Sequence, residues 1–529
     1  MKEELSALET ATISLNDCLA CSGCVTSAES VLVAQQSHTQ LITHLQQQTH
    51  ESRPLVVTLS RQSLASLGAR HGIPSLAAVA RKVSWFCTHV LGADRTLDLA
   101  PFRELALREA ESEFADRLRK HAARFPAPQL PVEPSEPVVA AAPRRVIRGG
   151  GGDGASTRRR RAGQAAGTDP TNAPPDLTTH RLPMLASSCP GWICYAEKTQ
   201  HWVLPLVAAG RSPQAVAGAA VRRAASPTSF HVAVMPCFDK KLEASRSDFL
   251  DAQSDLRDVD CVLATTELDR LMLDRDVLNQ LPRVMDGTAP LVPLTLAEFP
   301  ETEVLDPWFA ADTVTGELTE APVTELAGSS GGWMHRVMVA AAADVFDVDL
   351  SNPTVRDAWV VRKVGRTPDV VEWTVRPPPN QSVPPHNELR FAQVYGFTNI
   401  QNMLRKLRAG AATPHSPVYH YVEVMACPAG CVHGGGQLPP ESKSVTPRAW
   451  VEAVERVYFS SSSLTNASMG MDIIDEDAMD VDGPSMSPAD SVQAALAAAA
   501  AATGQEYAQL MRTEYSAVEG DFAVAVTGW

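Results

Sequence analysis

The cysteines of this chain are grouped in short motifs that lie far apart in its 529 residues. Three stand in the run NDCLACSGC, and four more fall in LASSCPGW, MPCFDKKLE and EVMACPAGCVHGGGQ. Ten cysteines are too few for a disulfide scaffold in a chain of this length, and their grouping favours metal binding in a reducing compartment. The metal sites that these motifs serve therefore constrain the fold.

Three of the motif cysteines follow strand-like apolar runs. These runs are LPMLASSC near residue 182, HVAVMPC near 231 and YHYVEVMAC near 419, and a fourth, DVDCVLATT, lies near 258. Helical stretches such as YAEKTQHWVLPLV and FTNIQNMLRKLRAG separate them, which predicts an α/β fold with mainly parallel strands. LVVTLS at 55–60, followed by RQSLASLGARHG, predicts a further β-α unit. Because ligands collect at the carboxyl ends of strands in open α/β sheets, we expect one shared site.

The shared site would contain four thiols, those of Cys189, Cys237, Cys427 and Cys431. Four sulfurs match the requirement of a 4Fe-4S cluster, and the glycines from Gly434 to Gly436 would let backbone approach the cluster or its partner group. The alternative is that each is a buried structural thiol, but all three motifs share the same strand-end context. Cys194, inside an expected helix, and Cys261, inside an expected strand, are predicted to be core residues.

The run NDCLACSGC has the C-x-x-C-x-x-C spacing of a cluster-binding loop, with its thiols at Cys18, Cys21 and Cys24. The competing interpretations are a zinc site that lacks its fourth ligand and a redox C-x-x-C pair with a neighbour. A ferredoxin-type cluster needs four thiolates, and the 17 residues before Cys18 contain no cysteine. Cys87, which stands among Trp, Phe and Val in RKVSWFCTHV, is predicted to be a core residue.

Charge and hydropathy exclude several other classes of protein. Lys and Arg number 46 against 61 Asp and Glu, and the resulting net charge of -15 argues against direct nucleic-acid binding. The N-terminus MKEELSALET lacks a basic start followed by an apolar run, and no run of about 18 apolar residues occurs. These observations argue against secretion and membrane insertion, and they favour a soluble cytoplasmic protein.

Two segments lack the composition of a packed core and are expected to be disordered insertions. Residues 127–180 are rich in Pro, Gly and Arg, and for their RRRR run a solvated charge run is favoured over a nuclear-localisation or anion-binding patch. Residues 460–502 combine serine-rich, acidic and alanine-rich runs, with little to build a core and at most a short helix at the tail. The predicted divisions are an N-terminal iron-sulfur segment at 1–53, the first part of an α/β domain at 54–126, an insertion at 127–180, a cluster-binding α/β domain at 181–459, a second insertion at 460–502 and a C-terminal segment at 503–529.

The motifs resemble those of a known superfamily. LASSCPGW, MPCFDKKLE and EVMACPAGCVHGGGQ are similar to T-S-C-C-P-x-W, M-P-C-x-x-K-x-x-E and E-x-M-A-C-x-x-G-C-x-x-G-G-G of the iron-only hydrogenases. LNDCLACSGCVTSAE and LASSCPGWICYAEKT resemble more closely the Nar family (nuclear prelamin A recognition factor-like proteins), a eukaryotic branch of cytosolic iron-sulfur assembly factors. The resemblance covers residues 11–126, 181–458 and 505–529, and it implies a two-lobed α/β hydrogenase-like fold.

The same resemblance implies two 4Fe-4S clusters. The four strand-end cysteines would bind a buried cluster between the lobes, and the three cysteines of NDCLACSGC would bind a second cluster nearer the surface. The family supplies the fourth cysteine of the second cluster from well upstream of this loop. We therefore expect either a chain truncated at its N-terminus or an altered N-terminal cluster.

The residue before Cys189 bears on whether the protein is an enzyme. In the hydrogenases the position that matches Ser188 is usually a cysteine that passes protons to a two-iron subsite, and a serine hydroxyl is a far weaker acid. Lys240 and Glu243 retain the M-P-C-x-x-K-x-x-E pattern, which fits either an anion-binding pocket or a Lys240 paired with a nearby carboxylate. We expect a cluster carrier without hydrogenase activity; the alternative is a redox enzyme of the iron-only hydrogenase type.

The resemblance also implies partners. The chain would help to transfer clusters from the cytosolic scaffold ATPases, through a targeting complex, to apoproteins, with no direct nucleic-acid or membrane partner. The end of the chain, LMRTEYSAVEGDFAVAVTGW, resembles the family's end, and the ring and carboxylate of Trp529 suit capture by a basic pocket of the targeting complex. Cytoplasmic localisation is expected, with the nucleus as a second location.

Overall fold

The computed structural model describes residues 36–47, 53–124, 182–251, 254–302, 306, 328–378, 388–410, 417–460, 487–503 and 506–518. The predictions for the NDCLACSGC cysteines, for Trp529 and for the insertion at 127–180 fall outside these residues. No helix in the described ranges is both long enough and apolar enough to cross a membrane.

The first sheet has the strand order β2-β1-β4-β7, and all of its neighbouring pairs are parallel. Its strands are β1 (Leu55–Leu59), β2 (Arg95–Asp98), β4 (Phe230–Met235) and β7 (Cys261–Ala264). Every residue of β1, β4 and β7 is buried, as expected for a parallel sheet covered on both faces. The expected β-α unit is present, because β1 leads directly into α3 (Arg61–Arg70), whose N-cap Ser60 accepts a hydrogen bond from the backbone N–H of Ser63.

The second sheet has the order β3-β11-β10-β9-β8. Its strands are β3 (Met184–Ala186), β8 (Val360–Val364), β9 (Val370–Val375), β10 (Leu389–Tyr395) and β11 (Tyr421–Met425). β3, β11 and β10 are parallel, whereas β9 runs antiparallel to β10, and β8 runs antiparallel to β9. The α/β fold with mainly parallel strands is therefore confirmed, and the antiparallel pair at one edge adds to it.

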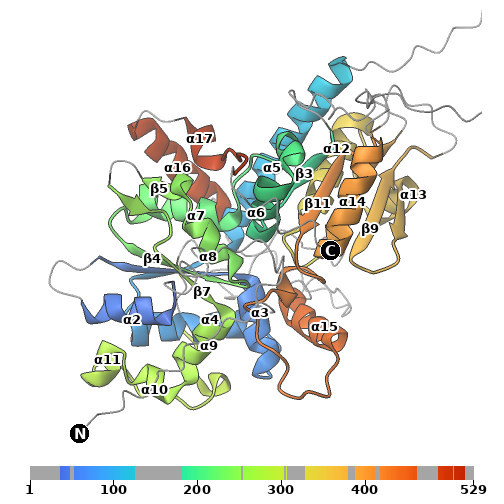
Figure 1. Ribbon diagram of the computed structural model, residues 1–529. Helices are drawn as coiled ribbons and strands as arrows, with labels where there is room; N and C mark the ends of the chain where they lie inside the picture. Colours follow the sequence, from blue (N-terminus) through green and yellow to red (C-terminus); the bar gives the residue numbers. More distant parts are fainter. Residues whose placement is uncertain are drawn as a thin grey trace, which may run out of the picture.

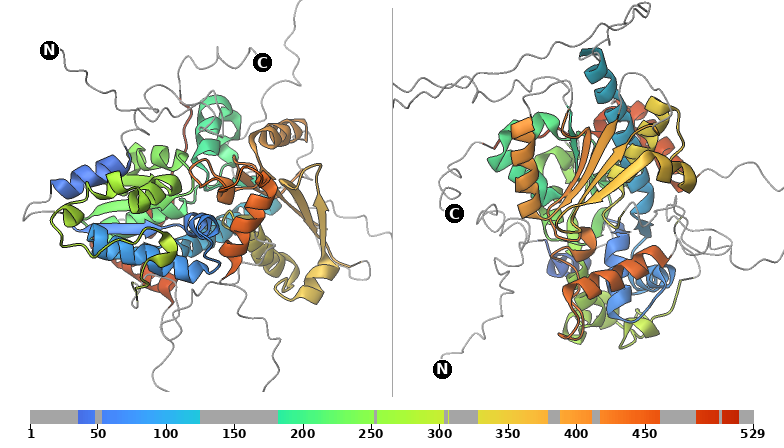
Figure 2. Two further views of the ribbon diagram at one scale, coloured as in Figure 1. Left: turned by 90° about the horizontal axis from the view of Figure 1, so that it is seen from below. Right: turned by 90° about the vertical axis from the view of Figure 1, so that its right-hand side faces the viewer.

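Helices form two groups, which Figures 1 and 2 show on either side of the first sheet. The group below it in Figure 1 contains α2 (His38–Gln46), α3, α4 (Leu76–Trp85), α9 (Thr265–Leu273), α10 (Arg275–Leu278), α11 (Pro282–Met285) and α15 (Pro447–Tyr458). The group above the first sheet contains α7 (Pro213–Ala220), α8 (Asp239–Ala244), α16 (Pro488–Thr503) and α17 (Tyr507–Met511), and it continues into the helices beside the second sheet, which are α5 (Ala100–Arg124), α6 (Pro190–Thr199), α12 (Trp333–Phe346), α13 (Pro353–Trp359) and α14 (Phe397–Gly410). The chain thus forms two lobes.

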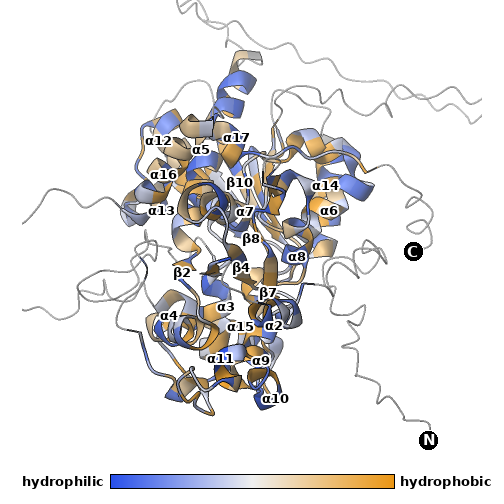
Figure 3. Cartoon of the chain, turned by 90° about the vertical axis from the view of Figure 1, so that its left-hand side faces the viewer, coloured by the Kyte–Doolittle hydropathy of each residue, from blue (hydrophilic) through white to orange (hydrophobic). Residues whose placement is uncertain are grey.

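The two lobes share the first sheet between their hydrophobic cores. Val56 and Leu97, on one face of this sheet, belong to the core that also contains the second sheet and α5. Val57 and Leu59 face the other way and pack with α3, α4 and α9. In Figure 3 the strands β4 and β7 are coloured as hydrophobic and lie between the two groups of helices. The carboxyl ends of both sheets consequently meet near the middle of the molecule.

The expectation that residues 460–502 have little to build a core is wrong for their last part. Residues 488–503 form α16, and its side chains Val492, Leu496 and Ala500, spaced four residues apart, are buried. Arg108 of α5 donates hydrogen bonds to Asp490 at 2.7 Å and to Gln493 at 2.9 Å. The alanines gave the segment a low-complexity composition, but their small side chains let the helix lie close against α5.

Candidate metal centre

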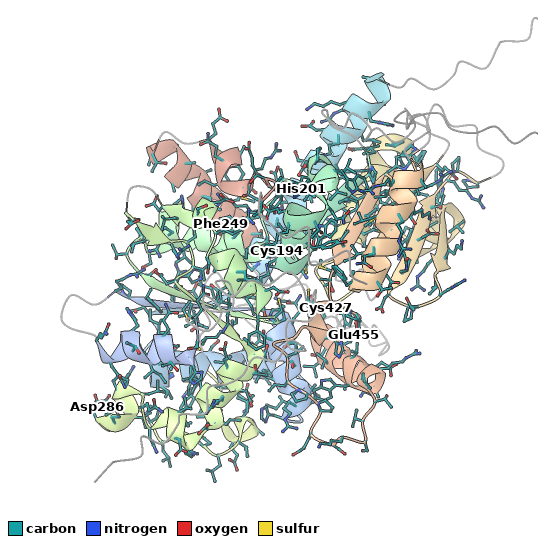
Figure 4. The ribbon with its side chains drawn as sticks, viewed as in Figure 1. Cys194, His201, Phe249, Asp286, Cys427 and Glu455 are labelled. Carbon is teal, nitrogen blue, oxygen red and sulfur yellow. The ribbon has the colours of Figure 1, made fainter. Side chains whose placement is uncertain are left out.

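Four cysteines line one cavity between the carboxyl ends of the two sheets. They are Cys189, Cys237, Cys427 and Cys431, and we call the space that they line the cysteine cavity. Cys189 follows β3, Cys427 follows β11 and Cys237 follows β4, so both sheets contribute. Figure 4 labels Cys427 between the second sheet and α15. The structure therefore brings together the four thiols that the sequence assigned to one site.

Hydrogen bonds join the three cysteine motifs LASSCPGW, MPCFDKKLE and EVMACPAGCVHGGGQ to one another. The backbone N–H of Cys189 donates to the Ser187 hydroxyl at 3.0 Å, and that hydroxyl donates to the carbonyl of Val424 in β11 at 2.5 Å. The N–H of Gly436 donates to the carbonyl of Pro236, the residue before Cys237, at 3.0 Å. The relative positions of the cysteines are thus fixed by the backbone around them.

Gly434 and Gly436 allow the Cys431 turn to reach the end of β4. A Cβ on Gly434 would lie 2.5 Å from the carbonyl oxygen of Pro236. A Cβ on Gly436 would lie 2.9 Å from the Cβ of Ala264 and 3.2 Å from the Cα of Cys237. The sequence predicted that these glycines let backbone approach a cluster or its partner group, which stays a prediction; the close approach that the described residues show is to the Cys237 motif.

Burial dominates the electrostatics of the four thiols. It raises the pKa of Cys431 to about 12 and also raises the pKa of Cys189, while that of Cys237 and Cys427 rises well above the usual range. Negative neighbours, including the other cysteines and Asp239, add to this effect. Burial and these neighbours therefore both favour the neutral thiol over the thiolate at each cysteine.

The number and type of the ligands match those of a 4Fe-4S cluster. Such a cluster is bound through a different iron at each corner, so its four thiolates surround a volume and do not converge on a point. Four cysteines around one cavity meet that requirement.

Ser188 and Lys240 also line the cysteine cavity. The ammonium of Lys240 donates to a carboxylate oxygen of Glu243 at 2.8 Å and to the Ser212 hydroxyl at 3.1 Å. Of the two interpretations of this pair, the structure bears out the lysine paired with a nearby carboxylate. Ser188 is half-buried, and it also lines a second cavity that lies beneath α6 and α8 and is bordered by Tyr515.

The three remaining cysteines were predicted to pack in the core. Cys87 and Cys261 are fully buried, and burial raises the pKa of each to about 12. Cys194 differs, because it is only half-buried and lines the second cavity together with Ser188. Its place on α6 was predicted from the sequence, but the direction in which it points was not.

Sequence reasoning missed several residues of the cavity wall. The hydroxyl of Ser330 accepts a hydrogen bond from the backbone N–H of Cys431 at 3.0 Å. Gln214 and Trp333 line the cavity while almost fully buried. Each has an atom, Gln214 Oε1 and Trp333 Nε1, that forms no hydrogen bond within the described part of the chain. The run GSSGGW at 328–333 was the available signal, because paired glycines before a helix indicate a tight turn.

Comparisons with known proteins agree on the region that carries these motifs. Residues 175–435 match the family model described as the iron only hydrogenase large subunit, C-terminal domain. Among solved structures, an FeFe-hydrogenase whose description concerns degradation of its H cluster 2Fe subcluster has a TM-score of 0.56 at 21% identity, covering 91% of this chain and 99% of that one. The FeFe-hydrogenase HydA1 from Chlamydomonas reinhardtii gives a TM-score of 0.55 at 20% identity, with the same coverage. The predicted hydrogenase-like fold is therefore confirmed.

Curated relatives extend over most of the chain. It is 35% identical over 465 residues to the cytosolic iron-sulfur assembly component 3 of Rattus norvegicus, covering 85% of this chain and 76% of that relative. It is 33% identical over 562 residues to the cytosolic Fe-S cluster assembly factor NAR1 of Mycosarcoma maydis, covering 83% and 64%. The cytosolic Fe-S cluster assembly factor narfl of Xenopus tropicalis is 35% identical over 464 residues, covering 85% and 76%.

Proposed function

Because this chain belongs to the Nar family of cytosolic iron-sulfur assembly factors, we propose that it carries a 4Fe-4S cluster on its four cavity cysteines and helps to pass clusters to apoproteins. The role in cytosolic iron-sulfur assembly follows from the family. The type and number of clusters, the transfer step and the partners are the content of the proposal.

One observation supports the buried cluster most strongly: four thiols from three distant motifs line a single cavity. The donor set fits the group, since soft sulfur ligands in a set of four are those of a 4Fe-4S cluster. The cavity wall fits it too, because the Nε1–H of Trp333 is a buried donor that lacks an acceptor within the described residues. When bound, the cluster supplies an iron-sulfide unit that can be handed on.

The chain's own residues prepare this site in two ways. Burial keeps the four sulfurs protonated before loading, because it raises the pKa of each thiol. Iron binds thiolates, so loading must release protons, and the affinity for the cluster is expected to fall as the pH is lowered. The hydrogen bonds of Ser187 and Ser330 hold the ligand turns in place before the cluster arrives.

Iron and sulfide analysis with EPR of the anaerobically purified protein tests the proposal. About eight irons per chain would correspond to two 4Fe-4S clusters, and about four to the buried one alone. Replacement of Cys427 by alanine should reduce the content of the buried cluster. An iron content near zero after anaerobic reconstitution would refute cluster binding.

We propose that the protein lacks hydrogenase activity. Ser188, which lines the cysteine cavity, has a hydroxyl that is a poor proton relay at neutral pH. The alternative, a redox enzyme of the iron-only hydrogenase type, predicts hydrogen evolution from the reconstituted protein with a strong reductant. Sustained turnover in that assay would exclude our proposal, and its absence in both the native chain and Ser188→Ala would support it.

We further propose that Cys18, Cys21 and Cys24 bind a second 4Fe-4S cluster. We also propose that the protein binds two kinds of partner, the cytosolic scaffold ATPases and the targeting complex. The same proposal assigns the protein to the cytoplasm, with the nucleus as a second location. In this proposal Trp529 contacts the targeting complex, since an indole beside a free carboxylate suits a basic pocket. Pull-down of targeting-complex subunits by the full chain and by a variant lacking Trp529 tests this contact, and equal recovery would remove Trp529 from the interface.

A further inference from the structure

Trp333 is a buried side chain whose indole N–H has no acceptor in the part of the chain that the structure describes. It is the first residue of α12, its exposed fraction is 4%, and it lines the cysteine cavity. Its Nε1–H forms no hydrogen bond with any described residue. A buried donor without an acceptor is costly, so such groups in folded proteins commonly indicate a partner that the protein itself does not provide.

The turn before α12 fixes where the indole nitrogen lies. Gly331 and Gly332 have φ values of 120° and 78°, which residues other than glycine rarely adopt. A Cβ on Gly331 would lie 2.8 Å from Nε1 of Trp333, so the nitrogen edge of the ring packs against the turn. Gly331 also lines the cysteine cavity, and the adjacent Ser330 holds the backbone of Cys431. One turn therefore positions both a cluster ligand and the free N–H.

The acceptor missing from this cavity is an electron-rich atom. Four thiolates and the bridging sulfides of an iron-sulfur cluster are all acceptors, and hydrogen bonds to these sulfurs stabilise the reduced, more negative state. We propose that Trp333 donates a hydrogen bond from Nε1 to a sulfur of the buried cluster and raises its reduction potential. This inference rests on the proposed function, because it requires that the four cysteines hold a cluster.

Trp333→Phe tests this role, because it removes the N–H and keeps an aromatic ring. In the anaerobically reconstituted full chain, iron and sulfide content should stay at the native level, while the midpoint potential from an EPR-monitored redox titration shifts to more negative values. Trp373→Phe is the matched control. Trp373 is also buried, and its Nε1 likewise has no partner among the described residues, but it lies on β9 and is not among the residues that line the cysteine cavity.

A second measurement needs no substitution in the cavity. With tryptophan labelled by 15N in the indole, pulsed ENDOR of the reduced native protein should show a 15N coupling, and this coupling should persist in Trp373→Phe. The absence of any 15N coupling, or equal potentials for the native chain and a loaded Trp333→Phe, would overturn the role of Trp333. Failure of the native chain to hold iron and sulfide would instead refute the proposed function, so the two failures can be told apart.

Discussion

At the scale of single residues, one close contact of the candidate site is made by Gly434. The backbone of Gly434 lies so close to the end of β4 that a Cβ would come within 2.5 Å of the Pro236 carbonyl oxygen. We expect Gly434→Ala to lower the free energy of unfolding by about 1–3 kcal/mol, as overpacking in a core does, and to reduce cluster content. Urea denaturation and iron analysis measure the two effects.

The matched control for this substitution is Gly210→Ala. A Cβ added at Gly210 would lie 3.6 Å from the Cγ of Glu109, which is an ordinary van der Waals contact. We expect a change within about 0.5 kcal/mol and unaltered iron content. If both variants behaved alike, the close approach of the Cys431 turn to β4 would not matter for the site.

His231 makes stability depend on pH. It is fully buried in β4, its ring nitrogens contact the Thr58 hydroxyl at 2.8 Å and the Asp258 carbonyl at 2.9 Å, and burial lowers its pKa to about 4. Between pH 6.5, the ordinary value, and pH 4 only the unfolded chain binds this proton. The free energy of unfolding should therefore fall by about 1.4 kcal/mol per pH unit over that window, and be unaffected by this group above it.

The contribution of His231 can be isolated by difference. In His231→Asn the unfolding free energy should be lower at pH 7, and its decline from pH 6.5 to pH 4 should be shallower than in the native chain. His201→Asn, at an exposed position, serves as control and should retain the native slope. Parallel curves for the native chain and His231→Asn would disprove this assignment.

The sequence identified the proposed metal ligands more easily than the residues that support them. Cysteines at strand ends carry a pattern that can be read directly, and the structure places all four around one cavity. Ser330 and Trp333 escaped notice because serine and tryptophan serve many purposes, and their positions depend on how a glycine turn folds. Lys240 was ambiguous, since only the structure shows which carboxylate it meets.

At the scale of elements, continuous apolar runs predicted the parallel strands well. β1, β4, β7 and β11 are buried along their whole length, and such strands stand out in the sequence. The antiparallel strands β8 and β9 went unpredicted, because β9 alternates between buried and half-buried residues and β8 is largely exposed. An edge strand of this kind looks like a polar loop in the sequence.

Helix α16 offers a test of the corrected second insertion. Leu496 is fully buried in the core that also contains α5, so Leu496→Ala should lower the free energy of unfolding by about 2–5 kcal/mol. Ala498→Ser, on an exposed position of the same helix, should change it by less than about 0.5 kcal/mol. Thermal and urea denaturation provide the comparison. An equally small effect of both substitutions would mean that α16 contributes little to the free energy of unfolding.

At the scale of the whole molecule, the cysteine cavity joins the two lobes. Its ligands follow strands of both sheets, so a bound cluster would cross-link them. We expect Cys427→Ala to lower the thermal stability of the loaded protein more than Cys21→Ala does. Cys21 lies outside the described residues. Differential scanning calorimetry with parallel iron analysis measures this. Equal iron loss with unchanged melting temperature in both variants would count against a cluster that holds the lobes together.

The wide separation of the four cysteines along the chain has a consequence for biosynthesis. Cys189 and Cys431 are 242 residues apart, the difference of their positions, and at roughly 5–20 residues per second a ribosome needs roughly 10–50 s to travel between them. During most of that interval Cys189 and Cys237 have been synthesised, whereas Cys427 and Cys431 have not. The complete ligand set therefore arises only once Cys431 has been made, and the cluster must be inserted into a chain whose described β-strands have all been synthesised.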